Sequence, residues 1–172
     1  MLKFLFLKEE NNMATFEDCI NKVLKHEGGY VNDPTDMGGE TKYGVSKRAY
    51  PDLDIKELTK DDAKAIYKKD YWNRFKIEKM PEGLRYIYFD MVLNMGYGNA
   101  AKVMQRSANA KNGASERIQV DGKVGPATRK ALKRVELERV RSERVLYYAR
   151  LVTKKPEQHR FWFGWFRRSL EV

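Results

Sequence analysis

The chain has 172 residues, enough for one compact domain or for a domain with a small appendage. Its 34 Lys and Arg outnumber its 24 Asp and Glu, and the net charge of +10 favours an anionic partner such as nucleic acid, anionic lipid or bacterial cell wall. The single cysteine, Cys19, excludes an intramolecular disulfide, and its place on an apolar helix stripe favours a buried thiol over a nucleophile. His26 and His159 lie far apart without the spacing of metal ligands, so we expect neither a metal nor a cofactor.

Residues 1–12 are expected to form an N-terminal extension outside the fold. Only four consecutive apolar residues (4–7) precede the charged residues 8–10, which is too short for the core of a signal peptide. No segment approaches the roughly 20 apolar residues of a membrane span. We therefore expect a protein that is made in the cytoplasm and has no membrane span.

The first helix is predicted to begin at Thr15, because Thr15-x-x-Asp18 is a capping-box pattern. One more turn of its apolar stripe places Glu27 on the core-facing side, just before Gly28 and Gly29 end the helix. Burial and the negative end of the helix dipole would both raise the pKa of this carboxyl group, as a general acid requires. The stripe that sets this phase is Phe16, Cys19, Ile20, Val23 and Leu24.

A glycine-rich segment follows and favours tight turns or a short irregular hairpin over a long regular element. Asp36 in this loop is expected to stay ionised and to orient or deprotonate a water molecule, which Thr41 could hold from the other side. One acid, a second carboxylate and a hydroxyl are the groups that glycosidic hydrolysis needs. The alternative is that Asp33, Asp36 and Thr41 only form Asx-type turns, and that a Glu at a helix end is an ordinary surface residue. For Asp33, which precedes a proline, the turn is the preferred interpretation.

Three helices are predicted in the middle of the chain: a short one capped by Ser46, one capped by Thr59-x-x-Asp62, and a third that begins near Pro81. Aromatic and polar side chains here could line a sugar cleft. Tyr30 and Tyr43 flank the acidic loop, and Trp72 lies off the apolar stripe that Tyr71 continues. Asp90 and Asn94 are one turn apart and either line the cleft or satisfy buried backbone, the second being slightly preferred for Asp90. The cleft candidates are Tyr30, Tyr43, Trp72, Asp90 and Asn94.

The C-terminal half is also strongly helical. A helix is predicted from Asn99, a second with Pro126 at its start, and a third through 135–152 that Pro156 ends. Aromatic residues at 161–166 are expected to pack back onto the helices, although a membrane-active tail is an alternative. The mixed charges of residues 133–141 and the absence of a nucleic-acid-binding motif argue against a nucleic-acid-binding protein.

The segment from His26 to Gly44 resembles the signature of glycoside hydrolase family 108, the N-acetylmuramidases of phage lysins and of bacterial "secretion activators". Later segments resemble the same family, including 65–72, 89–96 and Gly164-Trp165-x-x-Arg168. The resemblance implies that Glu27 is the catalytic acid. The order of Glu27, Asp36 and Thr41 resembles the catalytic triplet of phage-type lysozymes, with the hydroxyl one residue nearer the acid. The Asp-Gly…Gly-Pro-x-Thr run at 121–128 resembles small peptidoglycan-binding modules.

The sequence analysis thus predicts a mostly α, lysozyme-like fold with a glycine-rich active-site loop or short hairpin, packed with a helical C-terminal half. The predicted boundaries are 1–12 for the extension, 13–96 for the muramidase region and 97–172 for a peptidoglycan-binding-like region in the same compact unit. The expected activity is hydrolysis of the MurNAc–GlcNAc β-1,4 bond of peptidoglycan by a monomeric phage endolysin. The competing hypothesis is a non-catalytic peptidoglycan-binding or secretion-accessory protein.

Overall fold

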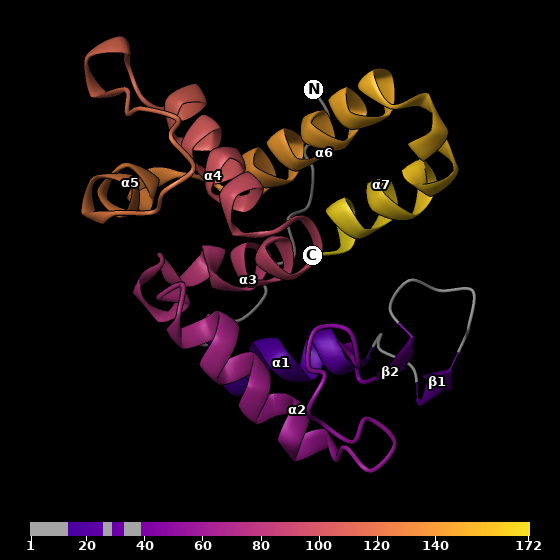
Figure 1. The fold of residues 1–172 in the computed structure, drawn as a ribbon. Helices are drawn as coiled ribbons and strands as arrows, with labels where there is room; N and C mark the ends of the chain where they lie inside the picture. Colours follow the sequence, from indigo (N-terminus) through magenta and orange to yellow (C-terminus); the bar gives the residue numbers. More distant parts are fainter. Residues whose placement is uncertain (1–13, 26–28, 33–38) are drawn as a thin grey trace, which may run out of the picture.

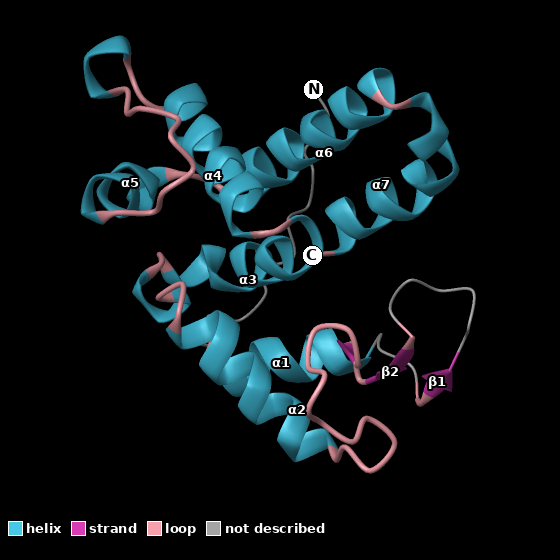
Figure 2. Ribbon diagram, viewed as in Figure 1, coloured by secondary structure: helices cyan, strands magenta, loops and turns pink. Residues whose placement is uncertain are grey.

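The computed structural model describes residues 14–25, 29–32 and 39–172 of the chain, and these are mainly helical with one small sheet (Figures 1 and 2). The α-helices are α1 (Phe16–Lys25), α2 (Lys60–Tyr67), α3 (Arg85–Met95), α4 (Tyr97–Lys111), α5 (Pro126–Ala131), α6 (Leu137–Lys154) and α7 (Trp162–Glu171). The strands are β1 (Val31–Asn32), β2 (Glu40–Lys42) and β3 (Val45–Ser46). The π-helical turn η1 (Lys68–Asn73) extends α2, and the 3₁₀ turns are η2 (Ile77–Lys79), η3 (Glu82–Leu84), η4 (Ala114–Glu116), η5 (Leu132–Arg134) and η6 (Pro156–Phe161). The predicted fold class, mostly α and lysozyme-like, is confirmed.

Helix α1 begins as the sequence predicts. The Thr15 backbone N–H donates to Asp18 Oδ2 at 3.0 Å, and the Asp18 N–H donates to Thr15 Oγ1 at 3.2 Å. These reciprocal bonds satisfy two donors that a helix N-terminus leaves free. The predicted apolar stripe is buried along its whole length.

A three-stranded antiparallel sheet follows α1 in the order β1-β2-β3. Val31 pairs with Thr41, and Thr41 pairs on its other side with Ser46. The tight β2–β3 turn places Tyr43 and Gly44 in the left-handed region, with φ of 51° and 76°. Ser46 is therefore a strand residue followed by a turn, which corrects the predicted short helix: pairing with Thr41 outweighs its capping tendency.

Helix α2 carries the second predicted capping box. The Thr59 side chain accepts a hydrogen bond from the Asp62 N–H, and the Asp62 side chain accepts one from the Thr59 N–H. The helix then widens into η1 without a break. A π-turn adds a residue to the helical turn, so it rotates the side chains that follow out of the α-helical phase.

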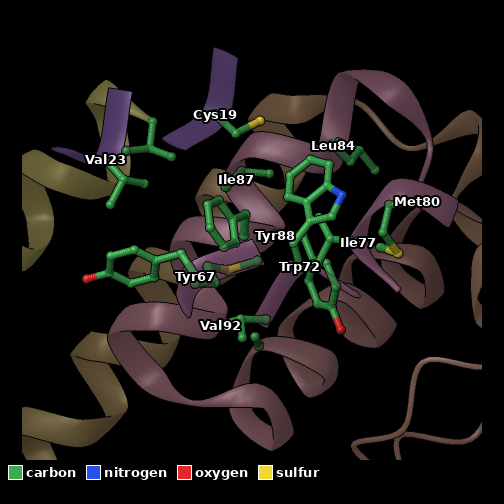
Figure 3. Packing of buried hydrophobic residues seen from close by; sticks show 14 of the residues in the cluster. Cys19, Val23, Tyr67, Trp72, Ile77, Met80, Leu84, Ile87, Tyr88 and Val92 are labelled. Atoms are coloured by element: carbon green, nitrogen blue, oxygen red, sulfur yellow. The ribbon is translucent and has the colours of Figure 1, made fainter. Parts of the chain in front are cut away.

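Helix α3 is central to the molecule, because α1 and η1 pack on it from one side and α4 follows and packs against it on the other (Figure 1). The core around it contains Cys19 from α1, Trp72 from η1 and Ile87, Tyr88 and Val92 from α3 (Figure 3). Burial raises the pKa of the Cys19 thiol to about 12. The expectation that Cys19 is a buried thiol is confirmed.

The C-terminal half ends in a hairpin formed by α6 and α7, which pack against each other (Figure 1). Trp165 of α7 stacks on Tyr148 of α6, with ring centroids 4.8 Å apart. The aromatic segment thus packs back in part, while the Phe163 side chain remains 71% exposed. No helix in the described part of the chain has the length and apolar character to cross a membrane.

Candidate active site

In the sequence, the predicted acidic residues fall between α1 and β2. Helix α1 ends at Lys25 and β2 begins at Glu40, so the predicted acid and its loop lie between these elements. Glu27 and Asp36 lie outside the described residues. The structure therefore describes the candidate site through the other predicted residues, from Tyr30 to Asn94.

Thr41 occupies the central strand of the sheet. Its backbone pairs with Val31 on one side and with Ser46 on the other, and its side chain is half-buried. A residue on a central strand is held by two neighbours, so the position of its hydroxyl is better fixed than it would be in a loop. This placement suits the predicted role of holding a water molecule, which stays a prediction.

Tyr30 and Glu40 form a polar pair at the start of the sheet. The Tyr30 hydroxyl donates to Glu40 Oε1 at 2.9 Å, and this hydrogen bond raises the pKa of the phenol. Tyr30 is exposed, as a cleft residue must be. The contact between Tyr30 and Glu40 depends on the β1–β2 register, in which Asn32 faces Glu40, so spacing in the sequence does not predict it.

Tyr43 lies in the turn that connects β2 to β3. Its carbonyl accepts a hydrogen bond of 3.0 Å from the Tyr67 hydroxyl of α2, and Lys42 Nζ lies 5.8 Å from the centre of its ring. The contact with Tyr67 attaches the turn to the helical core. Tyr43 is half-buried and close to Thr41 in sequence, and its predicted part in sugar binding stays a prediction.

A groove of about 440 Å³ opens beyond β3, between residues 49–53 and the end of α2 with η1. Tyr50 and Asp70 line it, and the Tyr50 hydroxyl donates to Asp70 Oδ2 at 2.9 Å. Burial, followed by this hydrogen bond, raises the pKa of Tyr50. The sequence gave no signal for this pair, because its members lie 20 residues apart and meet only when the turn packs on η1.

Trp72 is a core residue, which corrects its predicted place in a sugar cleft. Its side chain is 3% exposed and makes edge contacts with Phe16 and Phe89, at ring-centroid distances of 5.5 and 5.4 Å (Figure 3). The cause is the π-turn η1, which moves the inward-facing position from Tyr71 to Trp72.

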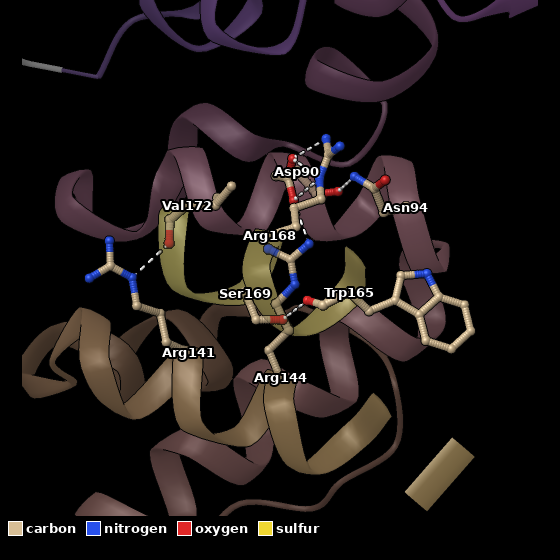
Figure 4. A network of polar contacts seen from close by, with 8 residues as sticks. All are labelled: Asp90, Asn94, Arg141, Arg144, Trp165, Arg168, Ser169 and Val172. Atoms are coloured by element: carbon tan, nitrogen blue, oxygen red, sulfur yellow. Dashed lines mark hydrogen bonds and ion pairs between the residues drawn. The ribbon is translucent and has the colours of Figure 1, made fainter. Parts of the chain in front are cut away.

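Asp90 is also buried, so it does not line a cleft, and its carboxylate binds side chains rather than the buried backbone that was slightly preferred. Its carboxylate accepts hydrogen bonds from two guanidinium groups: Arg144 Nη2 at 2.6 Å from Oδ2, and Arg168 Nη2 at 2.6 Å from Oδ1 (Figure 4). Asp90 and Arg144 are fully buried. We call Asp90, Arg144 and Arg168 the buried ion cluster; it joins α3 to the α6–α7 hairpin.

Asn94 lies one turn beyond Asp90 and is exposed. Its Nδ2 donates to the Asp90 carbonyl at 2.7 Å, so the amide is bonded to the backbone of its own helix (Figure 4). The role of Asn94 in sugar binding stays a prediction. In the described part of the chain, no group of three or more His, Cys, Asp or Glu residues could hold a metal ion.

Comparison with known proteins divides the chain into two matched regions. Residues 20–96 match the family described as glycosyl hydrolase 108, and residues 99–170 match the family described as a predicted peptidoglycan domain. Among solved structures, the chain is similar to Brucella abortus SagA, with 26% sequence identity and a TM-score of 0.73 over 93% of this chain and 92% of that one. No curated protein matches.

Proposed function

We propose that this chain, in which a glycosyl hydrolase 108 region is followed by a peptidoglycan domain, is a lysozyme-type N-acetylmuramidase. The family matches support a glycoside hydrolase related to peptidoglycan. The proposal adds the bond, which is the β-1,4 linkage between MurNAc and GlcNAc. It also adds a phage-endolysin role, in which the enzyme reaches the wall after release from the cytoplasm.

One observation carries the proposal: the residues assigned to catalysis fall within a glycosyl hydrolase match that begins in α1 and includes the sheet. Within it, Thr41 is held on the central strand. Tyr30 directly precedes β1, and Tyr43 lies in the β2–β3 turn. A hydroxyl on a paired strand, with one exposed and one half-buried tyrosine near it in the chain, suits the positioning of water and a sugar ring.

In the proposed mechanism, Glu27 protonates the leaving glycosidic oxygen while the anomeric carbon gains positive charge. Asp36 and Thr41 position a water molecule on the opposite face of the sugar, and its attack inverts the anomeric configuration. Inversion requires the two carboxyl groups to be about 6.5–9.5 Å apart, whereas a separation of about 5 Å would permit retention through a covalent intermediate.

The test is digestion of purified peptidoglycan by the wild-type protein and by Glu27→Gln. Glutamine keeps the size of the side chain but has no proton to give, so we expect turnover to fall at least about 10²-fold. Reducing-end labelling and mass spectrometry of the fragments should detect new MurNAc ends with the wild type only. Full activity of Glu27→Gln would contradict the proposal, and new GlcNAc ends or free peptides would show that another bond is cleaved.

A matched control is Glu17→Gln, the same change on an exposed carboxylate of α1. It should leave activity unchanged. If the wild-type protein releases no fragments but sediments with the wall, the non-catalytic binding protein replaces the enzyme as the better hypothesis.

A further inference from the structure

A second groove, of about 440 Å³, lies between the two matched regions and away from the acidic loop in sequence. We call it the cationic groove. Its lining residues from the first region follow η1 and continue into η2. Those from the second region lie in α5 and in the segment that leads into it, and Tyr97, at the start of α4, falls between the two matches. The residues used below are Arg74, Phe75, Lys76, Lys79, Tyr97 and Arg129.

The charge of the groove has one sign. Arg74, Lys76, Lys79 and Arg129 line it, and no Asp or Glu does. None of the four forms an ion pair with another described residue, although the Arg74 guanidinium lies 5.5 Å from the centre of the Phe75 ring. A hollow lined by one sign of charge concentrates the field and attracts ions of the opposite sign. The groove is therefore suited to an anion.

The groove also has a rigid aromatic wall, formed by Phe75 after η1 and Tyr97 at the start of α4. The rings of Phe75 and Tyr97 stack at 4.5 Å with an interplanar angle of 14°. The Tyr97 hydroxyl accepts a hydrogen bond of 3.0 Å from the Val124 N–H, which fixes the ring against the segment before α5. An apolar surface beside cations suits a ligand that carries methyl or methylene groups next to its charge.

One residue that lines the groove has an incompletely paired side chain. Arg129 Nη2 donates to the Val124 carbonyl at 3.2 Å, whereas its buried Nε has no partner among the described residues. Unpaired buried donors are rare in folded proteins and call for an explanation, such as a ligand or ordered water.

We propose that the cationic groove binds the carboxylate groups of peptidoglycan stem peptides, so that the wall contacts both regions of the protein at once. The volume exceeds that of a simple anion, since one water molecule takes about 30 Å³ of liquid. Stem peptides combine free carboxylates with small apolar side chains, which matches the four cations and the stacked rings. This inference rests on the proposed function, because it takes peptidoglycan as the substrate, and it names a part of that substrate away from the bond that is cleaved.

The test is titration calorimetry with the disaccharide GlcNAc–MurNAc that carries a stem peptide. This fragment contains no MurNAc–GlcNAc linkage, so binding can be measured without cleavage. The variant is Arg74→Gln/Lys76→Gln/Lys79→Gln, because all three side chains are exposed and Arg129, which has a backbone bond, is left intact. The control, Lys154→Gln/Lys155→Gln/Arg160→Gln, removes three exposed cations near the tip of the α6–α7 hairpin.

We expect the groove variant to bind the fragment at least tenfold more weakly than the wild type, and the control to bind it as the wild type does. The same disaccharide without its peptide should bind the wild type and the groove variant equally. Equal loss in both triple variants would overturn the proposal, because net charge alone would then account for binding. Equally strong binding of the peptide-free disaccharide, or displacement of the fragment by a peptide-free teichoic acid at equal charge concentration, would also overturn it.

The release of labelled MurNAc ends separates this inference from the proposed function. If the wild type cleaves peptidoglycan but the groove variant binds the fragment normally, only the proposed binding site in the groove is refuted. A protein that shows the tenfold difference in binding but releases no ends would refute the muramidase and leave the groove as a peptide-binding site.

Discussion

At the junction of α3 with the α6–α7 hairpin, one buried carboxylate holds two guanidinium groups, whereas around the sheet the polar contacts lie near the surface. The strands there have two or three residues each, and the Tyr30–Glu40 bond is exposed. The comparison indicates that buried ion pairs fix the junction with the C-terminal half, whereas the polar pair at the start of the sheet is exposed.

The largest effect is expected from Asp90→Asn. The variant keeps the shape of the side chain but leaves the fully buried Arg144 without its counter-charge. Removing one partner of a buried ion pair typically costs about 3–5 kcal/mol. The free energy of unfolding, measured in urea, should fall by that amount.

The control for Asp90→Asn is Glu17→Gln, which removes the exposed Lys64–Glu17 pair at 2.8 Å. Exposed pairs of this kind contribute about 0–1 kcal/mol. Similar losses for the two variants would contradict the contrast between the junction and the surface.

Local parts of this fold could be predicted from sequence, and parts that depend on distant partners could not. The boxes at Thr15 and Thr59 require residues only three positions away, and both form. The partners of Asp90 were harder to predict, because the two arginines lie 54 and 78 residues later in the chain. Proximity in the chain placed it beside Asn94, and only the packing of the hairpin onto α3 shows what its carboxylate does.

The candidate site follows the same division. The pattern around Thr41 predicted a short hairpin, and the sheet confirms that expectation, but the pairing of Tyr30 with Glu40 required the register. Trp72 was placed wrongly because a regular α-helical period was assumed through η1, where the helix is wider. A single residue added to a turn changes which side chain faces the core.

A moderate effect is expected from Thr59→Ala, which removes the N-terminal cap of α2. The Thr59 hydroxyl accepts the Asp62 N–H at 3.1 Å, and loss of such a cap costs typically about 1 kcal/mol. Urea unfolding should show this loss. Thr153→Ala is the matched control, since the Thr153 hydroxyl only donates to the Ala149 carbonyl within α6. Its expected change is within about 0.5 kcal/mol, and a larger loss there than at Thr59 would show that the cap is not what stabilises α2.

The smallest effect is expected at Glu136, an exposed carboxylate whose contribution to stability can be compared with that of the buried Asp90. Hydrogen bonds from Lys111, from its own backbone and from Arg139 lower its pKa from 4.5 to about 2. A carboxyl group whose pKa is lowered by folding stabilises the fold above its unfolded pKa, and this contribution is lost as the pH falls through the folded pKa. The free energy of unfolding should therefore decrease between about pH 4.5 and pH 2, in part because of Glu136.

Glu136→Gln should make this acid dependence shallower without abolishing it, because the pKa values of Asp18, Asp62 and Asp121 are also lowered by hydrogen bonds. The measurement is urea unfolding at intervals from pH 7 to pH 2. Glu138→Gln is the control, since Glu138 Oε1 lies 3.9 Å from Arg141 Nη1, beyond hydrogen-bond distance. If neither variant changes the pH dependence of the free energy of unfolding, the hydrogen bonds from Lys111 and Arg139 to Glu136 do not form in solution. The surface charges would then stabilise the fold even less, relative to the buried ion cluster, than we expect. If Glu138→Gln flattens the slope as much as Glu136→Gln, net charge rather than the Glu136 contacts sets the acid dependence.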